Sequence, residues 1–309
     1  MLPSLEQIVK ESLEANQASF VQLVEEARQL ICKEGGTIGN LVISGRLVTL
    51  KPQGKALVIG DIHGDLESLI HILKDSDSLK NMRQDKDAVT IFLGDYGDRG
   101  EFSVEVYYVV LKLKLSFPEQ VILMRGNHEG PEDLMASPHD LPLQFQAKFG
   151  EKRETGYSEL RELFACLYTA VLVKERYLMI HGGLPQHAKT TEDLAYAHAK
   201  HPEQDLLEDM LWSDPNPAIK GTQLSFRGAG KLFGEDVTAD LLERFHVKIL
   251  IRGHEPCDEG FKIDHNGRIL TLFSRKGSPY FNAHGAYLQL PLSERLKSAE
   301  QLAKYVHTF

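Results

Sequence analysis

The sequence predicts an α/β protein in which short buried strands alternate with helices. From about Leu41 onward, runs of Val and Ile are separated by stretches whose apolar residues recur every three or four positions. The first pattern is typical of buried strands and the second of amphipathic helices. Their alternation favours a sheet covered by helices over a β sandwich alone. Apolar and charged fractions of 42% and 26% exclude a disordered chain and a coiled-coil rod.

Residues 1–50 are predicted to form an N-terminal helical segment followed by a hairpin. Two S-x-x-Q patterns, at residues 4–7 and 19–22, are typical of capping boxes, so we expect two helices. The Gly-Gly pair at 35–36 should end the second helix. The Val- and Ile-rich stretch at 41–50, with a central Ser-Gly, predicts the hairpin. We expect the two helices to form a packing surface or a surface for a regulatory partner.

Helical periodicity recurs in the rest of the chain. The expected helices are Leu66–Leu73, Val104–Leu115, Glu159–Val171 and Ala239–Phe245. Residues 131–150 contain acidic residues and prolines without a clear period, which predicts a loop insertion. Residues 292–309 carry apolar residues at helical spacing and are predicted to form a C-terminal amphipathic helix.

Charge and cysteine content restrict the partners and the compartment. The chain has 35 Lys and Arg against 44 Asp and Glu, a net charge of −9, so its overall field attracts neither nucleic acid nor an acidic membrane. Cys32, Cys166 and Cys257 form no C-x-x-C pair, which indicates neither a disulfide framework nor a thiolate zinc site. No signal-peptide pattern is seen, and no apolar run approaches the ~18 residues of a membrane span. We therefore expect a cytoplasmic protein.

Five strand-like runs are each followed directly by polar residues beside glycine. They are ALVIG-DIHG (56–64), TIFLG-DYGDRG (90–100), VILM-RGNHE (121–129), YLMI-HGG (177–183) and VKILI-RGH (247–254). In open α/β sheets, ligands gather at the carboxyl ends of the strands. These runs should therefore bring six side chains into one crevice: Asp61, His63, Asp95, Asn127, His181 and His254.

This donor set consists of nitrogen and oxygen atoms only. Imidazole suits zinc, iron, copper or nickel, and carboxylate suits manganese or magnesium. Six side chains are more than one catalytic ion needs, whereas two ions ~3.5–4 Å apart, joined by a carboxylate and a hydroxide, would use them all. Asp95 is the expected bridge because it lies between the other ligands in chain order.

Further polar residues in the same motifs suit phosphate chemistry. Arg99 and Arg227 are candidates to hold phosphate oxygens through their planar guanidinium groups. A leaving alkoxide also needs a proton. His128 directly follows a predicted ligand, and an Asp such as Asp98 could fix its tautomer and raise its pKa, so that His128 acts as a general acid.

The ordered set of motifs resembles the signature of the PPP family of serine/threonine phosphatases, which have the calcineurin-like metallophosphoesterase fold. The motifs are GDIHG, GDYGDRG, RGNHE and HGG, followed by WSDP (212–215), RGAGKLFG (227–234), RGH (252–254) and LFS (272–274). The resemblance implies a central two-sheet β sandwich flanked by helices, with a metallophosphatase catalytic domain at 51–291. Gly97 departs from the usual Val, and the segments after RGNHE and after FS look closer to archaeal or bacterial members.

The resemblance also implies a role for each matching residue. Asp61, His63 and Asp95 would bind one metal ion, and Asp95, Asn127, His181 and His254 would bind the other. Arg99, Asn127, His128, Arg227 and Tyr280 would line the phosphate site, with Asp98 paired to His128. The expected ions are manganese, iron or zinc. The implied activity is hydrolysis of phosphoserine and phosphothreonine in proteins or phosphopeptides by hydroxide bound to the metal pair.

Two alternatives remain open from the sequence. The first is a phosphodiesterase or dinucleoside polyphosphate hydrolase of the same fold; Arg227 and the segment 274–280 favour the protein phosphatase. The second is a phosphoprotein-binding scaffold without turnover. Retention of all six ligands together with Asp98 and His128 argues against it, because binding alone needs no general acid.

Overall fold

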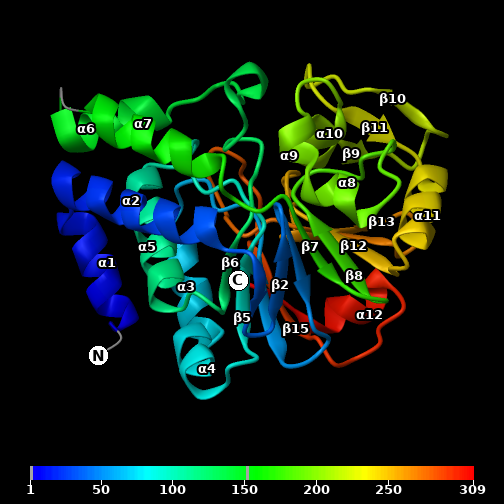
Figure 1. The fold of residues 1–309 in the computed structure, drawn as a ribbon, viewed down its shortest axis with the longest axis horizontal. Coiled ribbons are helices and arrows are strands. Elements are labelled where there is room, and N and C mark those ends of the chain that lie inside the picture. The colour runs from blue at the N-terminus through cyan, green and yellow to red at the C-terminus, as the bar shows by residue number, and fades with distance from the viewer. Residues whose placement is uncertain (1–2, 151–152) are drawn as a thin grey trace.

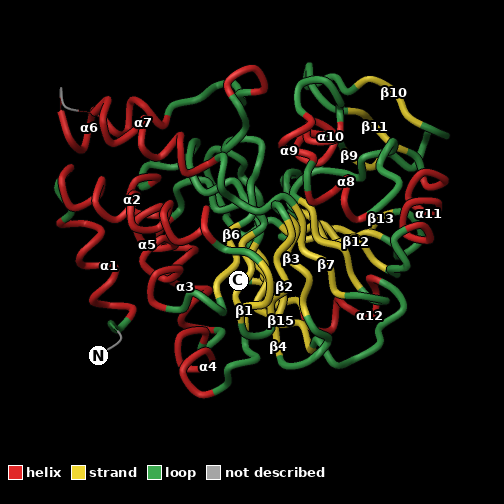
Figure 2. The backbone as a smooth tube through the Cα atoms, in the orientation of Figure 1, coloured by secondary structure: helices red, strands yellow, loops and turns green. Residues whose placement is uncertain are grey.

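The computed structural model describes residues 3–150 and 153–309, and two stacked β-sheets form its centre (Figures 1 and 2). The larger sheet has the order β1(Gly36–Ile38), β2(Leu41–Ser44), β3(Leu47–Leu50), β7(Ala170–Val173), β8(Tyr177–Ile180), β12(Ile249–Arg252), β14(Ile269–Leu272) and β13(Phe261–Asp264). The smaller has the order β16(Val306–Thr308), β15(Ala286–Pro291), β4(Lys55–Ile59), β5(Val89–Phe92) and β6(Val121–Leu123). The predicted two-sheet sandwich flanked by helices is confirmed.

Helices cover the two sides of this sandwich, as Figure 1 shows. One group consists of α1(Leu5–Glu14), α2(Gln17–Lys33), α3(Leu66–Asp75), α4(Ser78–Gln84), α5(Ser103–Ser116), α6(Leu141–Phe149) and α7(Arg153–Phe164). The other consists of α8(Thr191–Ala195), α9(Ala197–Lys200), α10(Leu206–Trp212) and α11(Glu235–Arg244), beside a small sheet of β10(Thr222–Leu224), β11(Lys231–Phe233) and β9(Asp214–Pro215).

The larger sheet is apolar on both faces because each face packs on a different core. Met179 and Ile251 belong to the core that fills the space between the two sheets. Their neighbours Leu178 and Leu250 belong to a second core under α8, α10 and α11. Successive side chains of a strand point to opposite faces. The continuous apolar runs of the sequence therefore follow from burial on both sides.

The N-terminal helices form as predicted, with one change at a cap. Ser4 caps α1 by accepting from the Gln7 N–H at 3.2 Å. At α2 the cap is Asn16, which accepts from the Ser19 N–H at 3.0 Å, so the capping role predicted for Ser19 is wrong. Asn is as good an N-cap as Ser, and its position lets α2 begin three residues earlier. Both helices pack against α5.

Two predicted helices are corrected by strand pairing. The helix expected at Glu159–Val171 ends at Phe164, because the following Ala170–Val173 pairs with β3 as β7. The C-terminal segment forms only a short helix, α12(Ala299–Leu302), and a 3₁₀ turn at Ala303–Tyr305. The chain then pairs with β15 as β16. In both places neighbouring strands supply hydrogen-bond partners that a helical pattern does not reveal.

Residues 131–150 are not a simple loop. They contain a 3₁₀ turn at Glu132–Leu134 and the helix α6, in which Leu141 and Phe145 are buried. Phe145 packs edge-on against Phe20 of α2, with ring centroids 5.3 Å apart. Only two side chains of α6 are buried, so its sequence shows no clear helical period.

Two of the three cysteines are joined, contrary to the sequence prediction. Cys32, at the end of α2, forms a disulfide with Cys166, just after α7, and their Cα atoms are 5.3 Å apart. The packing of α2 against α7 brings these residues together across 134 positions of sequence. Cys257 is free and buried. Spacing along the chain could not reveal a pairing made by helix packing.

A buried ion pair fixes the end of α2 to α5, and we expect it to be important for stability. Lys114 is fully buried, contacts Glu34 Oε1 at 2.8 Å and donates to the Val121 carbonyl at 3.0 Å. Lys114→Met leaves the Glu34 carboxylate buried without its cation and should destabilise the protein by ~3–5 kcal/mol. Urea unfolding measures this loss. The control is Lys112→Met on the same helix, whose partly exposed pair with Glu11 should contribute under about 1 kcal/mol. Equal effects of the two substitutions would contradict the prediction.

Strands from both ends of the chain enter the central sheets. β1 to β3 extend the larger sheet and β16 closes an edge of the smaller one. The division of the chain at residues 50 and 291 stays a prediction. Within residues 3–150 and 153–309, no helix is both long and apolar enough to cross a bilayer.

Candidate active site

The predicted ligands lie at one edge of the sandwich, where the carboxyl ends of the strands meet. In the smaller sheet β4, β5 and β6 are parallel, and in the larger sheet β8, β12 and β14 are parallel. Two isolated bridges join the sheets at this edge, Asp61 with Phe273 and Met124 with Tyr168. Loops from both sheets therefore end in one crevice, as the strand-end motifs predicted.

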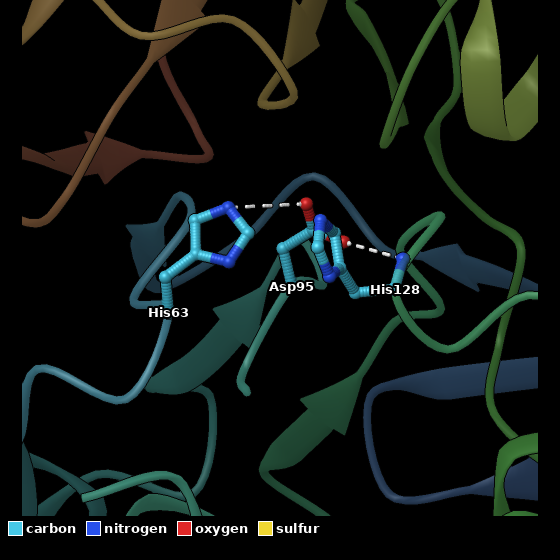
Figure 3. A group of neighbouring side chains, drawn as sticks. All are labelled: His63, Asp95 and His128. Carbon is cyan, nitrogen blue, oxygen red and sulfur yellow. Dashed lines mark hydrogen bonds and ion pairs between the residues drawn. The ribbon is translucent and has the colours of Figure 1, made fainter. Parts of the chain in front are cut away.

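Asp95 lies at the centre of the cluster. One of its carboxylate oxygens, Oδ2, is 3.4 Å from His63 Nε2, and the other, Oδ1, is 3.4 Å from His181 Nε2. Oδ1 also accepts the backbone N–H of His128 at 3.0 Å. Figure 3 shows Asp95 between His63 and His128. A carboxylate with one oxygen toward each of two histidines has the arrangement that a bridging ligand needs.

The remaining predicted ligands surround Asp95 on both sides. Asn127 Oδ1 is 3.0 Å from His181 Nε2 and 2.9 Å from His254 Nδ1. Asp61 Oδ2 is 3.8 Å from His63 Nε2, and its carboxylate accepts the His254 N–H. Each of these side chains is at most 5% exposed. The structure thus brings all six predicted ligands together in a buried cluster.

The rings of His63 and His181 are oriented so that their Nε2 atoms face the centre of the cluster. His63 Nδ1 is 2.9 Å from the Gly97 carbonyl and His181 Nδ1 is 3.0 Å from the Leu93 carbonyl. A carbonyl only accepts, so each Nδ1 carries a proton. Nε2 of each ring is therefore the nitrogen left for a metal ion, and it faces carboxylate or amide oxygens. Acceptors that face one another in a dry site repel, and a cation between them removes the repulsion. The residues present fit a metal centre.

The ionisation of these groups agrees with an anionic pocket. Burial lowers the pKa of His63 to about 3, so that ring stays neutral. Burial raises the pKa of Asp61 to about 7, and the nearby Asp95 carboxylate raises it further. For His181, burial alone would lower the pKa, but the Asp95 carboxylate outweighs it and raises the pKa to about 9. The Asp95 carboxylate contributes to the shifts of Asp61 and His181, and a divalent cation would compensate its charge.

Backbone geometry sets this cluster in place. His63, Asp95 and His254 all have positive φ, between 44° and 75°, a conformation that costs non-glycine residues roughly 1–3 kcal/mol each. The neighbouring Gly253 has no room for a side chain, because a Cβ there would lie 2.3 Å from Asp61 Oδ1. Strain of this kind concentrates at functional sites, where the surrounding structure holds it.

His128 and Asp98 are in contact, as the sequence predicted. His128 Nδ1 is 2.5 Å from Asp98 Oδ2, and both side chains are nearly buried. Burial alone would lower the pKa of His128, but the Asp95 and Asp98 carboxylates outweigh it and raise that pKa. The ring of His128 lies against that of His63, with centroids 4.7 Å apart. With Nδ1 held by Asp98, Nε2 is the atom of His128 available to a substrate.

A cavity of about 790 Å³ opens over this cluster. Its lining includes His63, Asp95, Arg99, Asn127, His128, Arg227, His254 and Tyr280, together with residues 133–138 of the insertion and the exposed Phe226. Arg99 and Tyr280 thus lie beside the predicted metal ligands, and the Tyr280 ring stacks on His63 with centroids 5.6 Å apart. The cavity exceeds what one phosphate needs, so it leaves room for the group that bears the phosphate.

Arg227 has a partner that the sequence did not suggest. Its Nε donates to Asp214 Oδ2 at 2.6 Å, and Asp214 Oδ1 accepts from the fully buried Arg252 at 2.9 Å. Asp214 therefore orients Arg227 at the cavity wall with its remaining guanidinium N–H groups available. Arg252 lies on β12 immediately before the ligand loop.

Glu129 is another residue whose role the structure defines. Its Oε2 accepts the N–H groups of Asp95 and Gly126 at 2.9 and 3.0 Å. Its Oε1 accepts from the Tyr96 N–H and the Tyr107 hydroxyl. Glu129 therefore ties the loops after β5 and β6 together. His139, which also contacts Asp98, was missed because it lies in the segment interpreted as a loop.

Residues 54–258 match the calcineurin-like phosphoesterase family. The chain belongs to this family. A catalytic chain of protein phosphatase 2A from Dictyostelium discoideum is 30% identical over 254 residues, covering 82% of this chain and 76% of that protein. Serine/threonine-protein phosphatase 5 of Rattus norvegicus is 32% identical over 276 residues, covering 88% of this chain and 52% of that protein. The chain thus spans about half the length of the rat relative. These relatives agree with the PPP resemblance of the sequence motifs.

A solved structure confirms the fold. A serine/threonine phosphatase from Saccharomyces cerevisiae, described as similar to human PP5, superposes with a TM-score of 0.74. The superposition covers 96% of this chain and 90% of that one, at 23% sequence identity. At this identity the comparison concerns the fold alone.

Proposed function

We propose that this protein is a metal-dependent phosphatase that hydrolyses phosphoserine and phosphothreonine monoesters in proteins. The observation that carries the proposal is the meeting of three elements on one cavity: the buried cluster of donors around Asp95, the His128–Asp98 pair, and the two arginines Arg99 and Arg227. The names of the relatives, which are protein phosphatases, support the same substrate class.

The donor set supports two metal ions. Asp61, His63 and Asp95 would hold one, and Asp95, Asn127, His181 and His254 would hold the other. Manganese, iron and zinc suit these nitrogen and oxygen ligands. When bound, such a pair supplies Lewis acidity and an activated water.

The chain's own groups would do the rest of the chemistry. Arg99 and Arg227 would hold phosphate oxygens through paired N–H groups, and the Asn127 amide and Tyr280 hydroxyl lie on the same wall. Asp98 accepts the Nδ1 proton of His128, so the Nε2 proton would pass to the leaving serine or threonine oxygen. The walls of the cavity would orient the ester for this transfer.

The test compares three substrates. Purified protein supplied with manganese is offered a phosphothreonine peptide, 4-nitrophenyl phosphate and a dinucleoside tetraphosphate, with chelator-treated protein as the control. We expect the highest kcat/KM on the peptide and no turnover after chelation. Turnover of the dinucleotide alone would replace the proposal with a polyphosphate hydrolase. No turnover of any substrate would favour a phosphoprotein-binding scaffold.

Two further expectations remain proposals. A regulatory partner on the N-terminal helices would contact the faces of α1 and α2 that do not pack on α5 and α7, where Leu13 is half exposed. A cytoplasmic location is the other proposal. We expected it partly because the cysteines seemed unpaired, and the Cys32–Cys166 disulfide does not fit that reason.

A further inference from the structure

Asp98, the partner of His128, is held from a segment outside the phosphatase motifs. Its Oδ1 accepts the backbone N–H groups of Asp140 and Leu141 at 2.9 and 2.7 Å. Its Oδ2, the oxygen that contacts His128 Nδ1, also contacts His139 Nδ1 at 2.8 Å. Three of these four contacts therefore come from residues 139–141, at the start of α6. All four acceptor positions of the carboxylate are occupied, which fixes its plane.

His139 is itself fixed at both ring nitrogens. Because Nδ1 meets a carboxylate, Nδ1 carries a proton and donates to Asp98. Nε2 lies 2.7 Å from the hydroxyl of Tyr157 on α7, which can donate to it. The His139 side chain is only 10% exposed. A chain of hydrogen bonds thus runs from Tyr157 through His139 to Asp98, where it meets His128.

Asp98 stays ionised in this arrangement. The carboxylate is 1% exposed, and such burial alone would raise its pKa. Hydrogen bonds from His128 and His139 outweigh burial and hold the pKa well below its usual range. Removing one of the two imidazoles would leave Oδ2 with a single donor and allow the carboxylate to turn away from the His128 ring.

We propose that His139 is a positioning residue that acts through Asp98 to hold the His128 ring in the orientation for proton donation. The inference rests on the proposed function. His139 is absent from the lining of the cavity, which includes residues 133–138, so it acts on the substrate only through Asp98. Residues 139–141 of the insertion thereby support the His128–Asp98 pair from outside the phosphatase motifs.

The test uses two substitutions at one position. His139→Asn keeps an N–H donor close to the place of Nδ1, whereas His139→Leu keeps the volume and removes the donor. Both variants are assayed with saturating manganese on a phosphoserine peptide and on 4-nitrophenyl phosphate. Nitrophenolate leaves without help from an acid, so its release depends little on His128.

We expect His139→Leu to lower kcat on the phosphoserine peptide by about 10-fold with KM nearly unchanged, a loss within the ~10–100-fold range of supporting contacts at such sites. The loss on 4-nitrophenyl phosphate should be under 2-fold by the leaving-group argument, roughly the assay error. His139→Asn should keep most of the peptide activity. Tyr157→Phe, which removes only one hydroxyl, should lower kcat on the peptide by a smaller factor in the same selective way.

Other outcomes would overturn the inference. Equal losses on both substrates, or His139→Asn no better than His139→Leu, would make His139 a purely structural residue. A fall in metal content of the His139 variants would make it a ligand, because the side chains of Asp98, His128 and His139 could also surround an ion. If His139→Leu does not fold, the test rests on Tyr157→Phe. Equal losses of kcat on both substrates in that variant would contradict the positioning role of His139. Failure of the proposed function is distinct, since wild-type protein would then not hydrolyse the peptide.

Discussion

His128→Asn is expected to lose most hydrolysis of alkyl phosphoesters while keeping its metal ions. A positioned general acid contributes ~10²–10⁴-fold to such reactions. The backbone N–H of His128 donates to Asp95 Oδ1 and survives the substitution. The His128 ring lies against that of His63, but its Nδ1 contacts Asp98. The measurements are kcat on a phosphothreonine peptide and metal content by elemental analysis.

The matched control is His284→Asn, the same substitution at an exposed position outside the site. It should leave both kcat and metal content unchanged. Activity of His128→Asn on 4-nitrophenyl phosphate should fall much less than activity on the peptide, because the better leaving group needs less protonation. Loss of metal together with activity would show that His128 is a ligand and that another group is the acid.

Asp95→Asn is expected to have a still larger effect, with loss of both metal ions and of activity. Its two oxygens face His63 and His181 on opposite sides, so one substitution weakens both halves of the cluster. Even supporting contacts around metal ligands change affinity by ~10–100-fold, so removal of the central charge should cost more than about 100-fold. The amide keeps the shape of the side chain and an acceptor for the His128 N–H. The readout is the number of ions bound at increasing manganese concentration.

The control for charge is Asp133→Asn. Asp133 lines the same cavity, but it is half exposed and pairs with His201 at 2.9 Å. It should bind two ions with unchanged affinity. If Asp95→Asn also bound two ions with wild-type affinity, Asp95 would not be the bridge. Loss of one ion only would place Asp95 on a single metal.

The convergence of the site could be predicted from the sequence because its signals are local. Each ligand follows its strand by one to four residues, so the strand and its ligand are read from the same short segment. Parallel strands end at one edge of a sheet, so the residues that follow them are expected to meet in a common crevice. Asp61, Asp95 and Asn127 reach the cluster in this way from β4, β5 and β6.

The departures arise where distant segments meet. The pairing of Cys32 with Cys166 depends on α2 packing against α7, and β16 forms only because β15 offers an open edge. The orientation of Arg227 depends on Asp214, and that of Asp98 on His139. None of these contacts produces a hydrophobic period or a sequence motif in either of the two segments that it joins.

The sequence by itself therefore determined the family, the six candidate ligands and the candidate acid pair, because these are encoded within single strand-end motifs. Only the tertiary structure decided which groups hold those residues in place. Glu129 ties two ligand loops together, and residues 139–141 fix Asp98, through contacts made after the chain has folded. Side-chain chemistry is local in the sequence, whereas the orientation on which catalysis depends is set by neighbours in space.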